Sequence, residues 1–427
     1  MDAAVNEAHP HPSVARGRVM LRATSPCVES LLDLEQARVW LRGEGWDVVE
    51  REVEADLVIV WTCGVDRTQE ERALREVRGL RARARPDQRV VVTGCLAAIQ
   101  RRVLEGERAG LVVAPSERVR LETLLAAETS LDEAVAERLD PGFSRSFPLA
   151  GSRIYRWILH GSDRLDGLLG TEVRDGWVRR VAWQPTRDMV FLRIASGCLG
   201  RCGYCAVRQA RGNLRSVPPR RVLERFEDHL RQGQRRITLV ATDAGAYGLD
   251  LGSDLAELLA QMLAWRGAFE LAIDYLSPDH LLRMADRLLP LLIDPRVRFL
   301  CVPVQSGSPA VLRAMRRDYD PEALLAVLLR LAESAPQLVI KGIFMVGHPG
   351  EDRDAFRQTM GFVARAPFHN LVALTYSPRP GTPSAALRDD VPLRVKRVRR
   401  WRLFAHWQGT RCLRRSPQRR EAGPSGT

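Results

Sequence analysis

Cys198, Cys202 and Cys205 stand within eight residues, in the stretch GCLGRCGYC that ends at position 205. Cysteine thiolates hold iron–sulfur clusters, and a cubane cluster ordinarily takes four of them. Three thiolates leave one iron open to a substrate or cofactor, much as a catalytic zinc keeps an open position. The pattern predicts such a cluster. It leaves open a zinc site completed by a distant ligand, or a set of unrelated buried thiols.

A second set of three cysteines precedes this stretch: Cys27, Cys63 and Cys95, each of which follows a short apolar run typical of a strand. In an open α/β sheet, ligands bind in the crevice outside the carboxyl ends of the strands, where three such side chains can converge. Eight cysteines in a chain of 427 residues are too few for a disulfide framework. We assign no role to Cys301 and Cys412.

The elements that must position these cysteines form two α/β series. The first has predicted strands at residues 18–24, 47–53, 56–62, 88–94 and 110–115, with helical patterns at 29–45, 67–84 and 117–127. The second has predicted strands at 188–197, 235–243, 269–275, 296–305, 337–347 and 370–377, each followed by a helical pattern. Repeated βα units predict a parallel, curved sheet, and Cys198 lies just beyond its first strand.

We therefore predict an α/β protein in four parts. An N-terminal open α/β sheet domain spans 18–127, a connector spans 128–187, a partial (βα)6 barrel spans 188–390, and an Arg-rich helical tail spans 391–427. The hydrophobic content of 45% suits packed cores, and neither a secretory signal nor a run of about 20 apolar residues is present in the sequence. We expect a cytoplasmic protein with no membrane partner.

The net charge of +13 is concentrated near the end of the sequence. Residues 391–427 contain eleven Lys and Arg and one acid, Glu421, so this segment carries +10. Such a segment is typical of RNA binding, and equally of a solvated basic helix with a frayed end. Almost every basic residue of the chain is Arg, the two lysines being Lys341 and Lys396.

The cysteine spacing after the first strand of a βα series resembles the radical S-adenosylmethionine (SAM) superfamily. In that superfamily the open iron binds SAM, and an electron from the cluster cleaves SAM to a 5′-deoxyadenosyl radical. The contexts SPC, VIVWTC and VVVTGCLA of the upstream cysteines are similar to the N-terminal domain of the methylthiotransferases, which carries a second cluster. Further similar stretches are PVQSGSPAVLRAMRRDY (303–319), VGHPGEDRDAFRQT (346–359) and YSPRPGTPSAA (376–386).

Two stretches, GCLGRCGYCAVRQARGNLRS and TDAGAYGLDLGS, are most similar to the branch of the family that methylthiolates N6-threonylcarbamoyladenosine in tRNA. That branch acts at the ring C2 position of the adenosine beside the anticodon. A C2–H bond is not acidic enough for ordinary base catalysis, so the cofactor carries the hard step. The implied partners are tRNA and an electron donor such as flavodoxin or ferredoxin.

The resemblance implies two [4Fe–4S] clusters and SAM as cofactors. It assigns the SAM-binding cluster to Cys198, Cys202 and Cys205 and the auxiliary cluster to Cys27, Cys63 and Cys95. It also implies SAM-pocket roles for Tyr204, Asp243, Gln305 and Ser306, although side chains of these types at strand ends are equally typical packing or hydrogen-bonding residues.

Several positions depart from the family pattern. Pro26 stands where a glycine is usual, Ser30 replaces an Asn, Thr242 replaces an acid, and Cys301 replaces a His. The family usually ends in a small β-rich RNA-binding domain, whereas the residues after Pro392 have a helical pattern. We therefore keep a second hypothesis, a radical SAM sulfur-transfer or methylthiolation enzyme that acts on a peptide or small natural product. A non-catalytic metal- or RNA-binding protein is disfavoured because both triads are complete.

Overall fold

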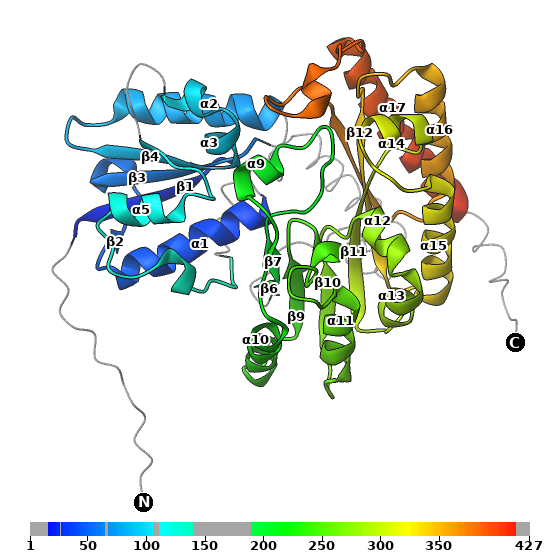
Figure 1. Ribbon diagram of the computed structural model, residues 1–427, viewed down its shortest axis with the longest axis horizontal. Helices are drawn as coiled ribbons and strands as arrows, with labels where there is room; N and C mark the ends of the chain where they lie inside the picture. The colour runs from blue at the N-terminus through cyan, green and yellow to red at the C-terminus, as the bar shows by residue number, and fades with distance from the viewer. Residues whose placement is uncertain (1–15, 26, 65–66, 106–110, 140–188, 416–427) are drawn as a thin grey trace, which may run out of the picture. The chain divides into compact units, whose positions relative to one another are not determined.

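The computed structural model describes residues 16–25, 27–64, 67–105, 111–139 and 189–415 (Figure 1). The chain forms two compact units, Met1–Ala136 and Glu137–Thr427. Most of the predicted connector, residues 140–187, lies outside the described residues. Each unit has its own sheet and its own hydrophobic core.

Five parallel strands form the sheet of the first unit, in the order β2-β1-β3-β4-β5. The strands are β1 (Arg18–Ala23), β2 (Asp47–Val48), β3 (Leu57–Thr62), β4 (Arg89–Gly94) and β5 (Leu111–Val112). All six residues of β3 are buried, as expected for a central parallel strand that is covered on both faces. Figure 1 shows α1 (Val28–Gly43) and α2 (Arg67–Arg83) on opposite faces of this sheet. The shorter helices are α3 (Cys95–Ile99), α4 (Arg101–Glu105), α5 (Arg118–Leu124), η1 (Glu52–Glu54) and η2 (Leu131–Glu133).

Six parallel strands form the large sheet of the second unit, in the order β13-β12-β11-β10-β9-β6. The strands are β6 (Met189–Arg193), β9 (Arg236–Val240), β10 (Glu270–Ile273), β11 (Val297–Gln305), β12 (Val339–Val346) and β13 (Asn370–Thr375). Each strand pairs with the next one of this series along the chain, which is the topology of a partial (βα)6 barrel. A short antiparallel pair, β7 (Ala195–Ser196) and β8 (Arg215–Ser216), brackets the cysteine-rich stretch.

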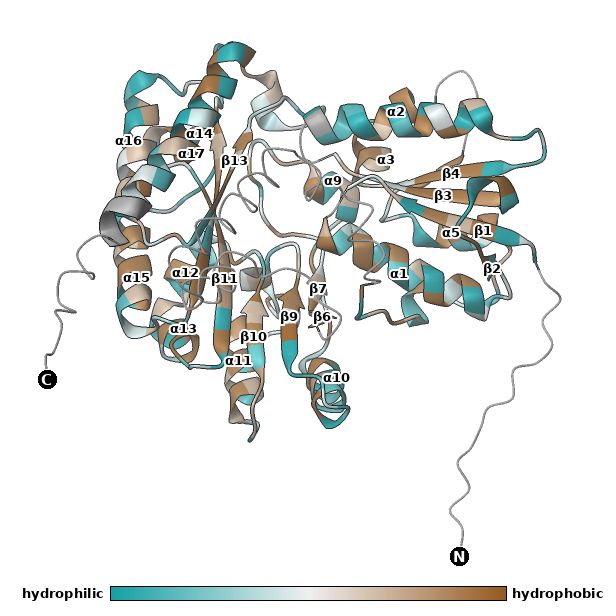
Figure 2. Cartoon of the chain, turned by 180° about the vertical axis from the view of Figure 1, so that it is seen from behind, coloured by the Kyte–Doolittle hydropathy of each residue, from teal (hydrophilic) through white to brown (hydrophobic). Residues whose placement is uncertain are grey.

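The second unit also contains helices, most of which lie on the outer side of the barrel. They are α9 (Val207–Arg211), α10 (Pro219–Arg231), α11 (Leu255–Ala264), α12 (Pro278–Arg283), α13 (Ala285–Leu292), α14 (Pro309–Ala314), α15 (Pro321–Ser334), α16 (Arg353–Arg365) and α17 (Leu393–Arg415), with η3 (Ala244–Ala246) and η4 (Pro383–Ala386) in loops. In Figure 2 the strands are largely hydrophobic, whereas the helices carry both hydrophobic and hydrophilic residues. This distribution is the one expected for helices that bury one side against a sheet.

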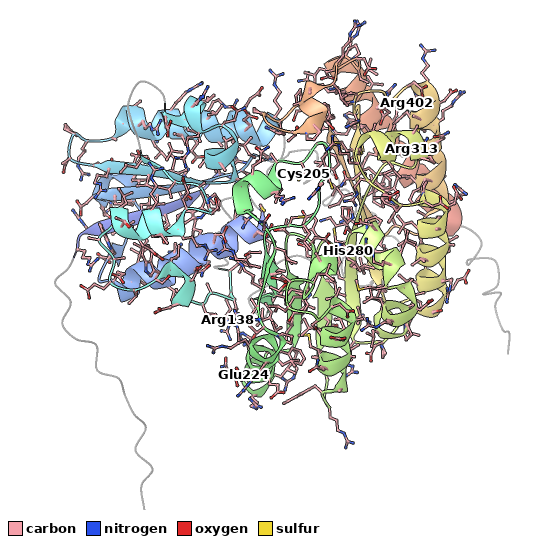
Figure 3. All side chains as sticks on the ribbon, viewed as in Figure 1. Arg138, Cys205, Glu224, His280, Arg313 and Arg402 are labelled. Carbon is pink, nitrogen blue, oxygen red and sulfur yellow. The ribbon has the colours of Figure 1, made fainter. Side chains whose placement is uncertain are left out.

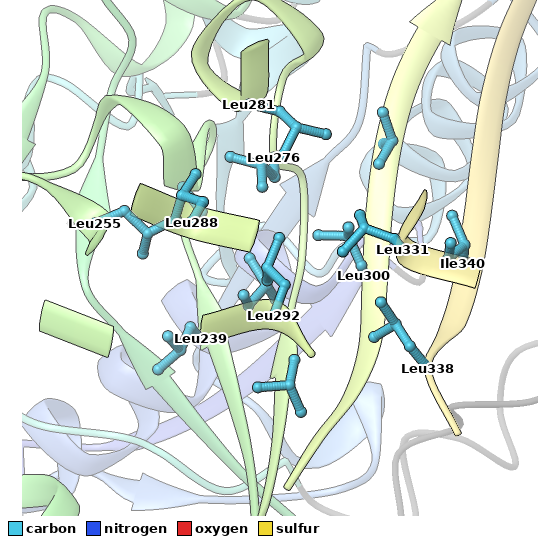
Figure 4. Close-up of a cluster of buried hydrophobic side chains, with 14 of the residues drawn as sticks. Leu239, Leu255, Leu276, Leu281, Leu288, Leu292, Leu300, Leu331, Leu338 and Ile340 are labelled. Carbon is cyan, nitrogen blue, oxygen red and sulfur yellow. The ribbon is translucent and has the colours of Figure 1, made fainter. Parts of the chain in front are cut away.

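The main core of the second unit lies between the barrel strands and these helices. Figure 4 shows Leu239, Leu300 and Ile340 from the strands beside Leu255, Leu288 and Leu331 from the helices. The alternate strand residues form a second buried cluster, which includes Ala272, Phe299, Cys301, Val339 and Ile343. The alternation places one set of side chains inside the barrel and the other set against the helices.

The C-terminal helix α17 packs against the barrel through one face. Its buried residues include Lys396, Arg399, Leu403 and Trp407, which recur every three or four positions and so lie on one side of the helix. Trp407 Nε1 donates a hydrogen bond to the Phe368 carbonyl at 3.1 Å. The predicted fold class is confirmed: an N-terminal α/β sheet domain, a partial barrel and a C-terminal helix. In the described part of the chain, no helix is long and apolar enough to cross a membrane.

Candidate metal centres

The first cysteine triad lies in the loop between β7 and α9, beyond the first barrel strand. Cys198, Cys202 and Cys205 form no disulfide, and all three are half-buried. A Cβ atom placed on Gly200 would lie 3.1 Å from the Sγ atom of Cys198 and 3.8 Å from that of Cys202. The sulfur atoms of Cys198 and Cys202 therefore both lie close to Gly200. Figure 3 labels Cys205 in the same loop.

Gly203 fastens the loop to two distant segments of the barrel. Its N–H donates to the Met315 carbonyl at 2.8 Å, and its carbonyl accepts from the Ser384 N–H at 2.7 Å. A Cβ atom on Gly203 would lie 2.8 Å from the Ser384 Oγ atom, which is closer than a side chain tolerates. The close approach explains why a glycine separates Cys202 from the next residues of the loop.

Ser384 is itself held by buried partners. The Nδ1 atom of His348 faces the Pro349 carbonyl at 3.0 Å, so Nδ1 carries the proton and Nε2 accepts from the Ser384 hydroxyl at 2.8 Å. Burial lowers the pKa of His348, which keeps the imidazole neutral for this role. The Tyr376 hydroxyl donates to the Ser384 carbonyl at 2.8 Å. His348 thus supports the cysteine loop through Ser384, a role that its sequence context did not indicate.

Arg317 is a site residue that the sequence analysis did not single out. Its guanidinium donates to the Cys202 Sγ atom at 3.4 Å and to the Pro303 carbonyl at 3.0 Å. The Asp279 carboxylate lies 3.8 Å away, and only 9% of the arginine side chain is exposed. A buried guanidinium stays cationic, so it brings a fixed positive charge to the thiol. The pair of arginines in MRRDY was the available signal, but spacing alone does not show which one faces the cysteines.

The environment of the triad disfavours free thiolates. Burial raises the pKa of the Cys198 thiol to about 11 and that of the Cys205 thiol to about 12. Backbone N–H groups oppose this rise, since Gly200 N donates to Cys198 Sγ at 3.1 Å and Val207 N donates to Cys205 Sγ at 3.4 Å. Sulfur atoms that already accept hydrogen bonds suit thiolates bound to a cationic centre, because metal binding favours the deprotonated form.

Asp243 and Ser306, two of the predicted SAM-pocket residues, make extensive internal hydrogen bonds. Asp243 accepts from the Ser277 hydroxyl at 2.5 Å and from the Gly245 N–H at 3.1 Å, and His280, labelled in Figure 3, lies 3.7 Å from it. Ser306 is fully buried, and its hydroxyl lies 3.0 Å from that of Thr359. Asp243 thus joins two loops at the carboxyl end of the barrel, and Ser306 joins the loop after β11 to α16.

Gln305 and Tyr204 differ from that pair. Gln305 ends β11 with a φ of +71°, a conformation that is rare for a residue with a side chain. Its Oε1 atom is buried and has no hydrogen-bond partner among the described residues, which leaves an acceptor for a bound molecule. Tyr204 packs beside the apolar cluster of Val311, Met315 and Ala355. The predicted SAM-pocket residues therefore all lie at the carboxyl end of the barrel. Asp243 and Ser306 have hydrogen-bond partners there, whereas Gln305 has an acceptor atom without one.

The second triad lies at the carboxyl edge of the first sheet. Cys27 directly precedes α1, Cys63 directly follows β3, and Cys95 directly follows β4. The strands β1, β3 and β4 are neighbours in the sheet, so the loops that follow them share one edge. Cys63 is buried, whereas Cys27 and Cys95 are half-buried.

Two glycines bring the loops of this triad close together. Gly94 has a φ of +92°, and a Cβ atom on it would lie 2.2 Å from the Thr62 carbonyl oxygen. The residues just before Cys63 and Cys95 are therefore in backbone contact. A Cβ atom on Gly64 would lie 2.9 Å from Ile99 in α3, the helix that begins at Cys95.

The arrangement of possible ligand side chains is relevant to the alternative of a zinc site. Among the residues that the structure describes, no three His, Cys, Asp or Glu side chains gather closely enough to hold a metal ion. The thiolates of a cubane cluster each bind a different iron atom, so they stand farther apart than the ligands of one zinc ion. Each set of three thiols, one in the loop that contains Gly203 and one in the loops around Gly94, has the number of ligands that a cubane cluster with one open iron takes.

Comparisons with known proteins identify the family. A model of the radical SAM superfamily matches residues 192–363, and a model of uncharacterized protein family UPF0004 matches residues 20–114. A probable threonylcarbamoyladenosine tRNA methylthiotransferase of Pyrococcus horikoshii is 30% identical over 363 residues, which are 84% of this chain and 77% of that protein. The chain belongs to the radical SAM methylthiotransferase family.

Relatives with a different named substrate match this radical SAM methylthiotransferase to a similar degree. A ribosomal protein uS12 methylthiotransferase RimO of Carboxydothermus hydrogenoformans is 30% identical over 379 residues, which are 86% of this chain and 77% of that protein. The solved radical SAM methyltransferase TsrM of Kitasatospora setae superposes with a TM-score of 0.55 at 16% identity, over 87% of this chain and 77% of that one. This last likeness concerns the fold alone.

The family assignment confirms the predicted enzyme class and cofactors. The protein is a radical SAM methylthiotransferase, and enzymes of this kind use SAM and two [4Fe–4S] clusters. The chain has two sets of three cysteines, one in each compact unit. The number of thiol triads therefore matches the number of clusters.

Proposed function

We propose that this enzyme inserts a methylthio group at C2 of N6-threonylcarbamoyladenosine, next to the anticodon of tRNA. Cys198, Cys202 and Cys205 hold the SAM-binding cluster, and the other triad, Cys27, Cys63 and Cys95, holds the auxiliary cluster. The reaction takes place in the cytoplasm with an electron donor such as flavodoxin or ferredoxin. When bound by these residues, the SAM-binding cluster would supply the one-electron chemistry that an unactivated C–H bond requires.

The charge of the C-terminal segment is the observation that favours tRNA over a protein substrate. Residues 391–427 carry +10 of the net +13, and no Asp or Glu occurs between residues 391 and 420. A surface of one sign attracts and holds a polyanion, and phosphate neutralisation supplies most of the affinity for nucleic acids. The relatives named as tRNA enzymes, which match over 84% of the chain, support the same substrate.

Residues of the chain itself hold the cysteine loop in place and offer groups that contact the cofactor or the substrate. Met315 and Ser384 fix the backbone of the cysteine loop at Gly203, and Arg317 places a cation beside Cys202. The free Oε1 atom of Gln305 accepts a hydrogen bond from SAM or substrate at the strand end. Rigid placement of the loop matters because a reactive species must meet one C–H bond rather than its neighbours.

A second candidate substrate is ribosomal protein uS12, which the names of several relatives contain. It agrees with the hypothesis of a peptide substrate. The same barrel and the same two triads would serve either reaction, so the choice depends on the surface that binds the substrate rather than on the cysteines.

Nucleoside mass spectrometry of tRNA from cells with and without the gene tests the proposal. We expect the methylthio-threonylcarbamoyladenosine signal to disappear in the deletion strain and to return with the wild-type gene. Cys202→Ala should fail to restore it, whereas Cys301→Ala, which removes a buried thiol outside both triads, should restore it. An unchanged tRNA profile in the deletion strain, together with loss of a methylthio group from uS12, would transfer the assignment to the second candidate.

A further inference from the structure

The helix α17 has two unlike faces. One face is anchored in the barrel: Lys396 Nζ lies 2.7 Å from both carboxylate oxygens of Asp389, and Arg399 Nη1 lies 2.7 Å from the buried Glu351 carboxylate. Leu403 and Trp407 continue this face with almost no exposed area. The anchoring makes α17 a fixed part of the second unit, so its other face has a defined orientation.

The opposite face combines cations with apolar and aromatic surface. Trp401 is 65% exposed, Val398 is 56% exposed and Phe404 is 38% exposed. Arg394 and Arg397 are exposed as well and lie seven and four residues before Trp401, which places all three in one row along the helix. With a rise of about 1.5 Å per residue, the two arginines stand about 10 Å and 6 Å from the tryptophan along the axis.

Two arginines of this face lack the acidic partners that several other arginines of the unit have. Arg220 pairs with Glu224, and Arg365 pairs with Glu322. Among the described residues, Arg394 and Arg397 have no carboxylate within ion-pair distance. Their charges are therefore available to an external anion.

We propose that this outer face of α17, made of Arg394, Arg397, Val398, Trp401 and Phe404, binds an unpaired segment of RNA. Trp401 stacks on one base, while Arg394 and Arg397 contact phosphates on the same strand. Exposed aromatic rings between arginines are how proteins hold single-stranded nucleic acid without reading its sequence. The identification of this RNA as the tRNA substrate, for example its anticodon loop, rests on the proposed function.

Binding of a fluorescent anticodon stem-loop to the full-length protein tests the inference at several salt concentrations. Trp401→Ala should weaken binding about tenfold without changing the salt dependence, because stacking involves no counterion release. Arg394→Gln/Arg397→Gln should reduce the slope of log K against log salt by about 0.7 for each lost phosphate contact. The control Arg266→Gln/Arg330→Gln removes the same charge from two other exposed positions of the unit and should retain the wild-type slope.

Each outcome supports or overturns the inference. Equal affinities and slopes for the α17 variants and the control would overturn it, as would weaker binding of a uS12-derived peptide with RNA binding unchanged. Thermal melting confirms that the variants, all at exposed positions, remain folded. If the α17 variants lose RNA binding while tRNA carries no methylthio product, the inference stands and the proposed function fails. If tRNA carries the methylthio product while the α17 variants bind RNA as the wild type does, the proposed function stands and the inference fails.

Discussion

The guanidinium of Arg317 contacts the Sγ atom of Cys202, and this contact bears on the reduction potential of a cluster held there. Hydrogen bonds to cluster sulfurs and nearby cations stabilise the more negative, reduced state and so raise the potential. We predict that Arg317→Met lowers the midpoint potential on the order of 50 mV, given that 59 mV is a tenfold change for one electron. A redox titration followed by electron paramagnetic resonance measures it.

The titration needs a protein with one cluster, so we would carry it out in a background with Cys27, Cys63 and Cys95 all changed to Ala. Arg317→Lys keeps the charge but loses the forked geometry, and should give an intermediate value. Arg313→Met, at the exposed position labelled in Figure 3, is the matched control. A potential in Arg317→Met equal to that of this control would show that the guanidinium does not tune the cluster.

A second prediction at the scale of single residues concerns Glu44 at the end of α1. Burial by itself raises its pKa, but hydrogen bonds from the Thr129 side chain and from the N–H groups of Glu128 and Thr129, together with the charge of Arg16, hold the pKa below its usual value. A lowered pKa means that ionised Glu44 stabilises the fold at neutral pH, and that this contribution fades as pH falls through the folded-state pKa.

We therefore expect Glu44→Gln to lower the free energy of unfolding of the first unit by about 2 kcal/mol at pH 7, the scale of hydrogen bonds to a charged group. The difference between wild type and variant should shrink as the pH falls below about 4. Urea denaturation followed through hydrogen exchange of the first unit measures it. A difference that stays constant from pH 7 to pH 3 would mean that the carboxylate charge is not what stabilises these contacts.

At the scale of elements, the strands were the most predictable part of the molecule. Residues 57–62 are an apolar run, residues 339–346 are apolar apart from Lys341 and Gly342, and both form interior parallel strands. The order of the six barrel strands followed from the repetition of βα units. The predicted strands at 47–53 and 110–115 shortened to two residues each, because pairing at the sheet edges decides where an edge strand ends.

The contacts that support the cysteine loop were not predictable in the same way. Gly203 and Ser384 are joined through the backbone although 180 residues separate them, and no local pattern links them. The cysteine spacing predicts which residues hold the proposed clusters, since ligand number and loop geometry impose that spacing. The roles of His348 and Arg317 depend on the packing of the barrel, which periodicity does not specify.

The junction of the cysteine loop with η4 supports a prediction at this scale. Gly203→Ala places a methyl group 2.8 Å from the Ser384 Oγ atom, so it should displace the loop and lower the iron content after reconstitution severalfold. Ser384→Ala removes that atom but keeps the N–H that binds the Gly203 carbonyl. Iron and sulfide analysis of both single variants and of the double variant measures the coupling.

We expect the double variant to bind more iron than Gly203→Ala alone, because the clash is relieved. Gly361→Ala, at a helical glycine with open space around its Cβ position, is the matched control and should bind iron normally. Additive losses in the double variant would show that Gly203→Ala acts through the backbone of its own loop and not through Ser384.

At the scale of the whole molecule, the first part of the basic C-terminal segment is the helix α17, which packs against the barrel. The face of α17 that contains Leu403 and Trp407 covers residues near β13, the last strand of the sheet. Each compact unit has a hydrophobic core of its own, Leu80 and Val92 contributing to the first and Leu403 to the second. Loss of the α17 anchor should therefore affect one unit and spare the other.

Trp407→Ala tests this independence. It removes a side chain that is 4% exposed, together with its hydrogen bond to the Phe368 carbonyl, and should cost about 3–5 kcal/mol. Hydrogen exchange measured by mass spectrometry should then speed up in β12, β13, α16 and α17, while amides in β3 and β4 of the first unit exchange as in the wild type. The exposed Trp401→Ala is the matched control, because it removes the same side chain from the other face of the helix. Faster exchange in both units after Trp407→Ala would mean that the two cores unfold as one cooperative body. The stability of the first unit would then depend on the packing of α17 against the second.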